Sequence, residues 1–139
     1  MSVDIAFPVE FIVEGTAVSL SAKRRESVAE WKERVKAAGK RVLPDGYFAN
    51  DGRLAVTLYY FPDAEMQGDI DNIVKPVLDA MNQDIYLDDR QVERVVVQKF
   101  EPGGIFLFSA PSVILERALK GSKPALYIRL SDNPSEDLI

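Results

Sequence analysis

The feature that most constrains the fold is a regular alternation of side chains in the segment RLAVTLYYF, residues 53–61. Every second residue there is large and apolar, namely Leu54, Val56, Leu58 and Tyr60. A period of two places such residues on one face of a β-strand. Pro62 ends the strand, because proline has no N–H to donate to a β-ladder. The apolar face then requires a covering layer, which indicates helices packed on a sheet.

Further elements follow from periodicity and from turn residues. Helices are expected over residues 21–38, about 71–82 and 111–120, and further strands over residues 3–13, 92–100, 104–108 and 125–130. The order β-α-β-α-β-β-α-β predicts an α/β (α+β) fold in which helices pack on a mixed β-sheet. The chain has no linker or repeat, so residues 1–139 are expected to form a single domain.

Two helix boundaries carry specific signals. Ser27 and Glu30 fit the S-x-x-E capping box, which would start the first helix late and leave Lys23, Arg24 and Arg25 in the preceding loop. Gly39 is expected to stop that helix. Pro111 is expected at the first position of the last helix, with Gly121 closing it.

The residue types that are missing restrict the chemistry. The chain contains no cysteine and no histidine, which excludes thiol nucleophiles, zinc-thiolate sites and histidine bases. Any reaction must therefore use carboxylates, lysine, arginine, hydroxyls, water or a metal held by oxygen. No apolar run approaches the roughly 20 residues that span a bilayer, and the N-terminus has no basic region typical of a signal peptide. We expect a cytoplasmic protein with no membrane contact.

Charge is distributed unevenly. The net charge is -5, which on its own argues against a nucleic-acid partner. Residues 22–42, however, hold eight basic and three acidic residues, a local balance of +5. One end of the molecule can thus be basic, although a solvated helix of mixed charge is the alternative.

The segment GDIDNIVKPVLDAMNQDIYLDD, residues 68–89, holds six aspartates. Like charges this close repel, and we expect a divalent cation between Asp69, Asp71 and the Asp88–Asp89 pair to offset the repulsion. An N-cap role would explain Asp71 alone, but not Asp69 and Asp71 together. Asp88 and Asp89 are consecutive and point in different directions, so one is expected to be a ligand and the other a cap or turn residue.

Lys75 stands one helical turn beyond Asp71. An ordinary i,i+4 salt bridge is the structural alternative to a catalytic role for this lysine. Pro76 requires that the helix either starts late or is kinked beside Lys75.

Oxygen ligands select hard cations, which indicates Mg²⁺, with Mn²⁺ as a possible substitute. An EF-hand loop is excluded, because Val74 and Ala80 stand where glycine and glutamate would be required. Carboxylates around such an ion with a lysine nearby suit phosphodiester hydrolysis. Spacing alone leaves a plain acidic loop as the alternative.

The segment DIDNIVKPVLDAMNQDIYLDDRQV, residues 69–92, resembles the signature D-x-D-N-x-x-K-x-x-x-D-A … D-D-x-Q-V of the RusA-type Holliday-junction resolvases. The resemblance implies a small homodimeric, Mg²⁺-dependent endonuclease of DNA recombination and repair. It would cut four-way (Holliday) junctions by metal-activated attack of water on the phosphodiester. Carried over by position, Asp69, Asp71 and Asp89 would bind the metal, and Lys75 would be the catalytic lysine. Asp88 is the second choice for the third carboxylate.

The chain departs from the family pattern in its acidity and in residues 103–124, which look longer than a simple hairpin and include an apparent extra helix. Lys23, Arg24, Arg25 and the face of the first helix are candidates for phosphate contacts with branched DNA. Three other interpretations remain open. They are a non-catalytic relative that binds nucleic acid or protein, a phosphodiesterase acting on small nucleotides, and an acidic domain whose aspartates are caps.

Overall fold

The computed structural model describes residues 6–18, 25–47, 49–66 and 68–136. Its strands are β1 (Val9–Glu14), β2 (Leu54–Phe61), β3 (Val92–Lys99) and β4 (Ala125–Ser131). Its helices are α1 (Arg25–Arg41), α2 (Val74–Met81) and α3 (Val113–Lys120), with two short 3₁₀ helices, η1 (Ile70–Ile73) and η2 (Asp89–Gln91). In the described part of the chain, no helix is long and apolar enough to cross a membrane.

The four strands form one sheet in the order β1-β4-β2-β3. β4 pairs antiparallel with both β1 and β2, whereas β2 and β3 are parallel. The sheet is therefore mixed, which confirms the predicted fold class. Because two parallel neighbours require a crossover, the chain between β2 and β3 must run back along the sheet.

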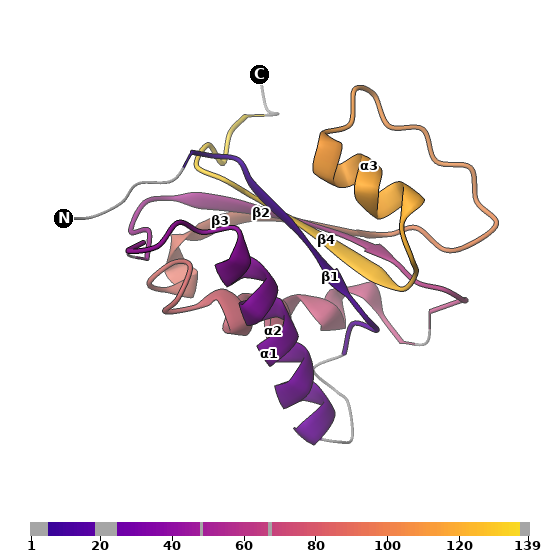
Figure 1. Cartoon of the computed structure of the whole chain (residues 1–139), viewed down its shortest axis with the longest axis horizontal. Helices are drawn as coiled ribbons and strands as arrows, with labels where there is room; N and C mark the ends of the chain where they lie inside the picture. Colours follow the sequence, from indigo (N-terminus) through magenta and orange to yellow (C-terminus); the bar gives the residue numbers. More distant parts are fainter. Residues whose placement is uncertain (1–5, 19–24, 48, 67, 137–139) are drawn as a thin grey trace.

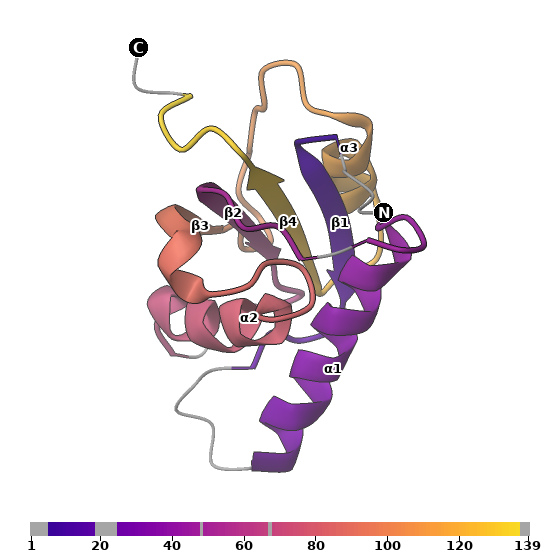
Figure 2. The same ribbon diagram turned by 90° about the vertical axis from the view of Figure 1, so that its left-hand side faces the viewer.

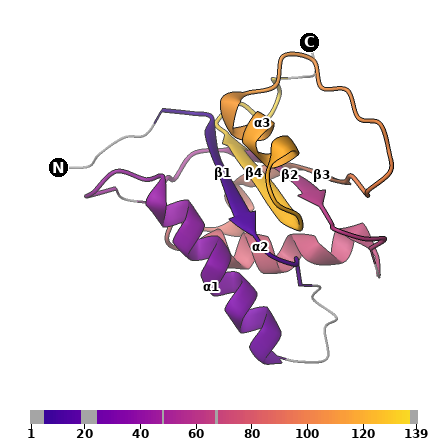
Figure 3. The same ribbon diagram turned by 45° about the vertical axis from the view of Figure 1, so that its right-hand side comes forward.

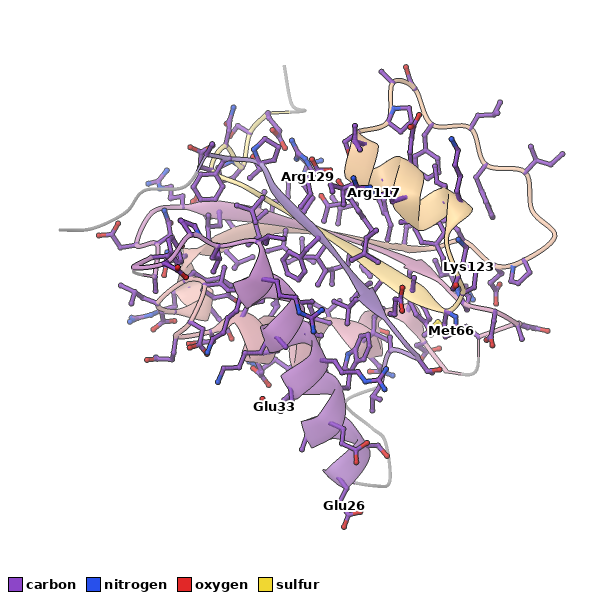
Figure 4. The ribbon with its side chains drawn as sticks, viewed as in Figure 1. Glu26, Glu33, Met66, Arg117, Lys123 and Arg129 are labelled. Atoms are coloured by element: carbon purple, nitrogen blue, oxygen red, sulfur yellow. The ribbon has the colours of Figure 1, made fainter. Side chains whose placement is uncertain are left out.

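Helices cover both faces of the sheet. α1 and α2 lie on one face and α3 lies on the other (Figures 1 and 2). The main core lies under α1 and α2 and includes Trp31, Val35, Val77 and Met81. A smaller core under α3 is aromatic and includes Phe61, Phe100 and Tyr127. Arg129 projects on the α3 side (Figure 4).

The expected strand at residues 104–108 is wrong, because this segment forms no regular structure. It belongs to the long connection that extends away from the sheet before α3 (Figure 3). Phe106 and Phe108 pack on Phe100, while Ile105 and Leu107 are 91% and 94% exposed. The alternation is real, but the segment lies over an aromatic cluster instead of beside a strand, so its backbone has no ladder partner.

The predicted boundaries of the first helix are also wrong. α1 begins before Ser27, so no capping box starts it there, and it continues through Gly39 to Arg41. A Cβ at Gly39 would stand 2.5 Å from Cδ1 of Ile85 and 3.3 Å from Cζ of Phe11. This glycine therefore serves close packing rather than helix termination. Residues 21–24 of the predicted helix lie outside the described residues.

Two further boundaries shift by a few residues. Ser112, not Pro111, begins the last helix, since the Ser112 hydroxyl accepts a hydrogen bond from the N–H of Leu115 at 3.1 Å. Gly121 ends α3 as predicted. β1 begins at Val9, directly after Pro8, so the described part of residues 3–13 is a strand only from Val9 onward.

Candidate active site

The acidic segment forms most of the crossover between β2 and β3. After β2, the chain passes through η1 into α2, which contacts α1. Pro76 is the third residue of α2, and the N–H groups of the first turn have no partner within a helix, so proline costs little there. The helix thus starts late, one of the two arrangements that Pro76 predicts. Ile73, Val77 and Met81 are fully buried and anchor the crossover to the core.

The chain then returns along α2. The Tyr86 hydroxyl lies 3.0 Å from the carbonyl oxygen of Leu78, and the Lys75 ammonium lies 3.0 Å from Oδ2 of Asp89. Residues 82–89 therefore run back beside α2, with Tyr86 next to Leu78 and Asp89 next to Lys75, about one helical turn earlier. This return brings Asp89 to Lys75 in the first turn of α2.

Asp89 is held by two groups at once. Its Oδ1 accepts a hydrogen bond from the buried Tyr86 hydroxyl at 2.8 Å, while Oδ2 faces Lys75. Partial burial raises the pKa of Asp89, but the Lys75 and Tyr86 contacts outweigh burial and leave it below its ordinary value. Burial and the Asp89 carboxylate both raise the pKa of Tyr86, so its hydroxyl remains a neutral donor. Sequence reasoning missed Tyr86, because its partner lies three residues away across a turn.

Lys75 is shared between two carboxylates. Its ammonium lies 2.7 Å from Oδ1 of Asp79 as well as 3.0 Å from Asp89. Contacts with Asp79 first, and with Asp89 second, raise the pKa of the lysine, so it is charged at neutral pH. The i,i+4 salt bridge expected as an alternative is present, but with Asp79, and it coexists with the contact to Asp89. About half of the Lys75 side chain is exposed, so its ammonium is accessible to a ligand.

Gln91 fixes the turn that carries Asp89. Its side-chain oxygen accepts hydrogen bonds from the N–H groups of Leu87 and Asp88, at 2.8 and 2.9 Å. Its side-chain nitrogen donates to the carbonyl oxygens of Asn50 and Gly52, both at 2.8 Å. One amide thus ties this turn to the loop before β2. The glutamine is part of the sequence signature, but the sequence gives no partner for it.

Asp88 has the role of a cap. Its side chain accepts from the N–H of Arg90 at 2.9 Å, and with Gln91 it forms a capping box that starts η2. These hydrogen bonds, together with the Arg90 guanidinium, lower the pKa of Asp88. The cap that was expected for one member of the Asp88–Asp89 pair therefore falls on Asp88.

Basic side chains offset most of the acidic repulsion. Asp79 pairs with Lys32 of α1 as well as with Lys75, and Asp84 pairs with Lys36 and Lys40 of α1. The lysines of α1 thus neutralise acids of the crossover, so fewer basic side chains of this helix can contact a phosphate. Of the other phosphate candidates, Lys23 and Arg24 lie outside the described residues, and Arg25 is the first residue of α1.

Asp69 and Asp71 are the other two of the six aspartates in residues 68–89. Within the described residues, neither carboxylate has a hydrogen-bond or ion-pair partner, and both side chains are exposed. Asp69 occupies the position before η1 without a side-chain cap bond, and Asp71 lies inside η1. The N-cap role considered for Asp71 is therefore wrong. These two acids have no structural role that the fold explains.

The donor set fits a hard cation, since all three predicted ligands are carboxylates and two of them have no partner among the residues that the structure describes. In residues 6–18, 25–47, 49–66 and 68–136, no three Asp or Glu side chains stand close enough to hold one metal ion. The structure brings Asp89 to Lys75, and places Asp69 and Asp71 at η1, which contacts β3. Joint binding of an ion by Asp69, Asp71 and Asp89 stays a prediction.

Comparison with known proteins gives one family. The family model described as Endodeoxyribonuclease RusA matches residues 14–107, which is more than half of the chain. The matched range contains η1, α2, η2 and β3, and with them every candidate residue of the site. A search of curated proteins gives no match.

Proposed function

The chain belongs to the RusA family of endodeoxyribonucleases, and from this premise we propose that it is a Mg²⁺-dependent nuclease that resolves four-way DNA junctions. Its catalytic group would consist of Asp69, Asp71, Lys75 and Asp89. The three carboxylates would hold the cation, for which Mn²⁺ could substitute.

One observation carries the proposal. Asp69 and Asp71 are the two aspartates of residues 68–89 that the described structure leaves unpaired, and they follow β2 in the family-matched segment. The other four aspartates have basic or hydrogen-bonding partners. Two exposed acids that have no partner in the described part of the chain, at the start of a crossover whose return brings Asp89 to Lys75, suit cation binding better than they suit stability.

The residues divide the chemistry between them. A bound cation would activate water and stabilise phosphoryl oxygens. Lys75 is charged and half-exposed, so its ammonium can contact a phosphate and offset the negative charge that develops on it. Tyr86 keeps Asp89 in place by donating a hydrogen bond to its Oδ1, and Gln91 holds the turn before Asp89 by accepting a hydrogen bond from the N–H of Asp88. The chain contains no histidine, so no imidazole is available to accept or donate the proton.

The test is cleavage of a synthetic four-way junction in Mg²⁺, with a linear duplex of the same sequence beside it. We expect junction cleavage by the native chain, and a loss of at least about 100-fold in Asp71→Asn, because losing a metal ligand should cost more than losing a residue that only hydrogen-bonds to a ligand. Asp84→Asn is the matched control. It removes the same charge from the same segment, but Asp84 pairs with Lys36 and Lys40 of α1.

Other outcomes would contradict the proposal. Tight junction binding without cleavage in Mg²⁺ or Mn²⁺ would indicate a binding protein. Hydrolysis of a small chromogenic diester without preference for branched DNA would indicate a phosphodiesterase. We also propose a homodimer, because symmetric cutting of two strands requires two sites. Light scattering after gel filtration, with a mass near twice 15.5 kDa, would support the dimer, and the monomer mass would refute it.

A further inference from the structure

Lys75 contacts a carboxylate that the proposed cation also needs. The Lys75 ammonium lies 3.0 Å from Oδ2 of Asp89, and the Tyr86 hydroxyl occupies the other oxygen, Oδ1. Both oxygens of Asp89 are therefore engaged by donors of this chain. A divalent cation bound to Asp89 would have to share or displace one of them, and two positive charges repel at such distances.

We propose that Lys75 competes with the divalent cation for Asp89, so that the lysine sets the cation affinity of the site before DNA binds. The inference rests on the proposed function, since it takes Asp89 as a cation ligand. In this arrangement Lys75 would leave Asp89 when a cation is bound there, and its ammonium would then be available to a phosphate.

Asp79 supplies the second acceptor that such an exchange requires. Its Oδ1 lies 2.7 Å from the Lys75 ammonium, whereas its Oδ2 faces Lys32 at 3.5 Å. An ammonium has three donors, so Lys75 can leave Asp89 and still keep its contact with Asp79. Because Asp79 lies one helical turn from Lys75, the lysine stays over the first turn of α2 throughout.

Tyr86 supplies the same kind of alternative on the other side of Asp89. Its hydroxyl has one proton and two acceptors within reach, Oδ1 of Asp89 at 2.8 Å and the carbonyl oxygen of Leu78 at 3.0 Å. If a cation takes Oδ1, the hydroxyl can turn to Leu78 without leaving a buried donor unpaired. Both partners of Asp89 thus have a second acceptor, Asp79 for Lys75 and the carbonyl oxygen of Leu78 for Tyr86.

The test is Mn²⁺ binding by isothermal titration calorimetry without DNA. We expect Lys75→Met to bind Mn²⁺ about 3- to 10-fold more tightly than the native chain, although the same variant cleaves junctions more slowly. This is the range of one charge-assisted contact at a half-exposed site. Lys32→Met is the matched control. It removes an equal charge that also pairs with Asp79 but, within the described structure, forms no ion pair with Asp89, and we expect a change of less than about twofold.

The outcomes separate this inference from the proposed function. If the native chain binds no Mn²⁺ at millimolar concentration, the proposed metal site fails and the inference fails with it. If the native chain binds Mn²⁺ but Lys75→Met binds no more tightly, the inference alone is overturned. An equal gain in Lys32→Met would show a general charge effect and would also overturn it. Lys75→Gln repeats the measurement if the methionine variant does not fold, as judged by circular dichroism.

Discussion

The hydrogen bonds of Gln91 make a sharp prediction for the nearly isosteric substitution Gln91→Glu. The substitution keeps the oxygen that accepts from Leu87 and Asp88, but it replaces the NH₂ donor with an anionic oxygen. That oxygen would face the carbonyl oxygens of Asn50 and Gly52, which lie 2.8 Å from the native nitrogen. Two donated hydrogen bonds are lost, and two repulsive contacts replace them.

The magnitude follows from these contacts. Each lost hydrogen bond is worth about 0.5–1.5 kcal/mol, and repulsion of the anion adds to this, so we expect a loss of about 2–4 kcal/mol in unfolding free energy. For a domain of this size, that corresponds to a fall of roughly 10 °C in the melting temperature. Gln98→Glu on the exposed part of β3 is the matched control and should change the melting temperature little.

The pH dependence gives a second readout of the same substitution. Facing two carbonyls, the introduced carboxyl should have a folded-state pKa above its unfolded value of about 4.3. The folded variant then binds more protons than the unfolded chain, so its stability relative to the native chain falls as pH rises and recovers as pH falls. We expect the deficit at pH 7.5, measured by thermal melts of both chains, to shrink at pH 4.5. An unchanged melting temperature at pH 7.5, or a deficit that does not shrink with acid, would refute the assigned hydrogen bonds.

Two further substitutions test the packing and the site. Gly39→Ala should gain about 1 kcal/mol in helix propensity but lose more stability because the added methyl group would contact buried Ile85 and Phe11. We expect a net loss of about 1 kcal/mol in unfolding free energy, measured by thermal melts. A stabilised variant would contradict this packing. Tyr86→Phe should slow junction cleavage roughly tenfold through kcat and lower the melting temperature by a few degrees. Tyr127→Phe, which loses a similar hydroxyl–carboxylate bond on the α3 face, should lower only the melting temperature; equal effects on cleavage would contradict the role of Tyr86.

Much of the fold was predictable, because its strands and helices carry clear periods. β2 matches its predicted range within one residue, and the buried row Ile73, Val77 and Met81 follows from spacing alone. Two of the wrong predictions share one cause: Gly39 and residues 104–108 match local rules that long-range contacts override. A glycine ends a helix unless a neighbour needs the space, and alternating side chains form a strand only where another strand is free to pair.

The site was predictable in composition but not in geometry. The sequence places the acids and the lysine in one segment, and the pairing of Lys75 with an acid one turn away follows from helical spacing. That Asp89 returns to Lys75 depends on the path of residues 82–89, which no period encodes. The sequence also gives no sign that lysines of α1 neutralise Asp79 and Asp84, since those partners are 44 or more positions away.

The family match and the sheet order together show where this fold can vary. The match ends at residue 107, before α3 and β4, yet β4 lies between β1 and β2 in the sheet. Without β4, β1 would have no partner in the sheet and β2 would keep only β3, so the last strand is essential to the fold. α3 is different, because it covers the face opposite α1 and α2 (Figures 1 and 2). Glu101 accepts a hydrogen bond from the N–H of Met66, in the connection from β2 to η1, so it belongs with the crossover. Changes in residues 102–121 can therefore alter that face while β2, α2 and β3 still carry the site.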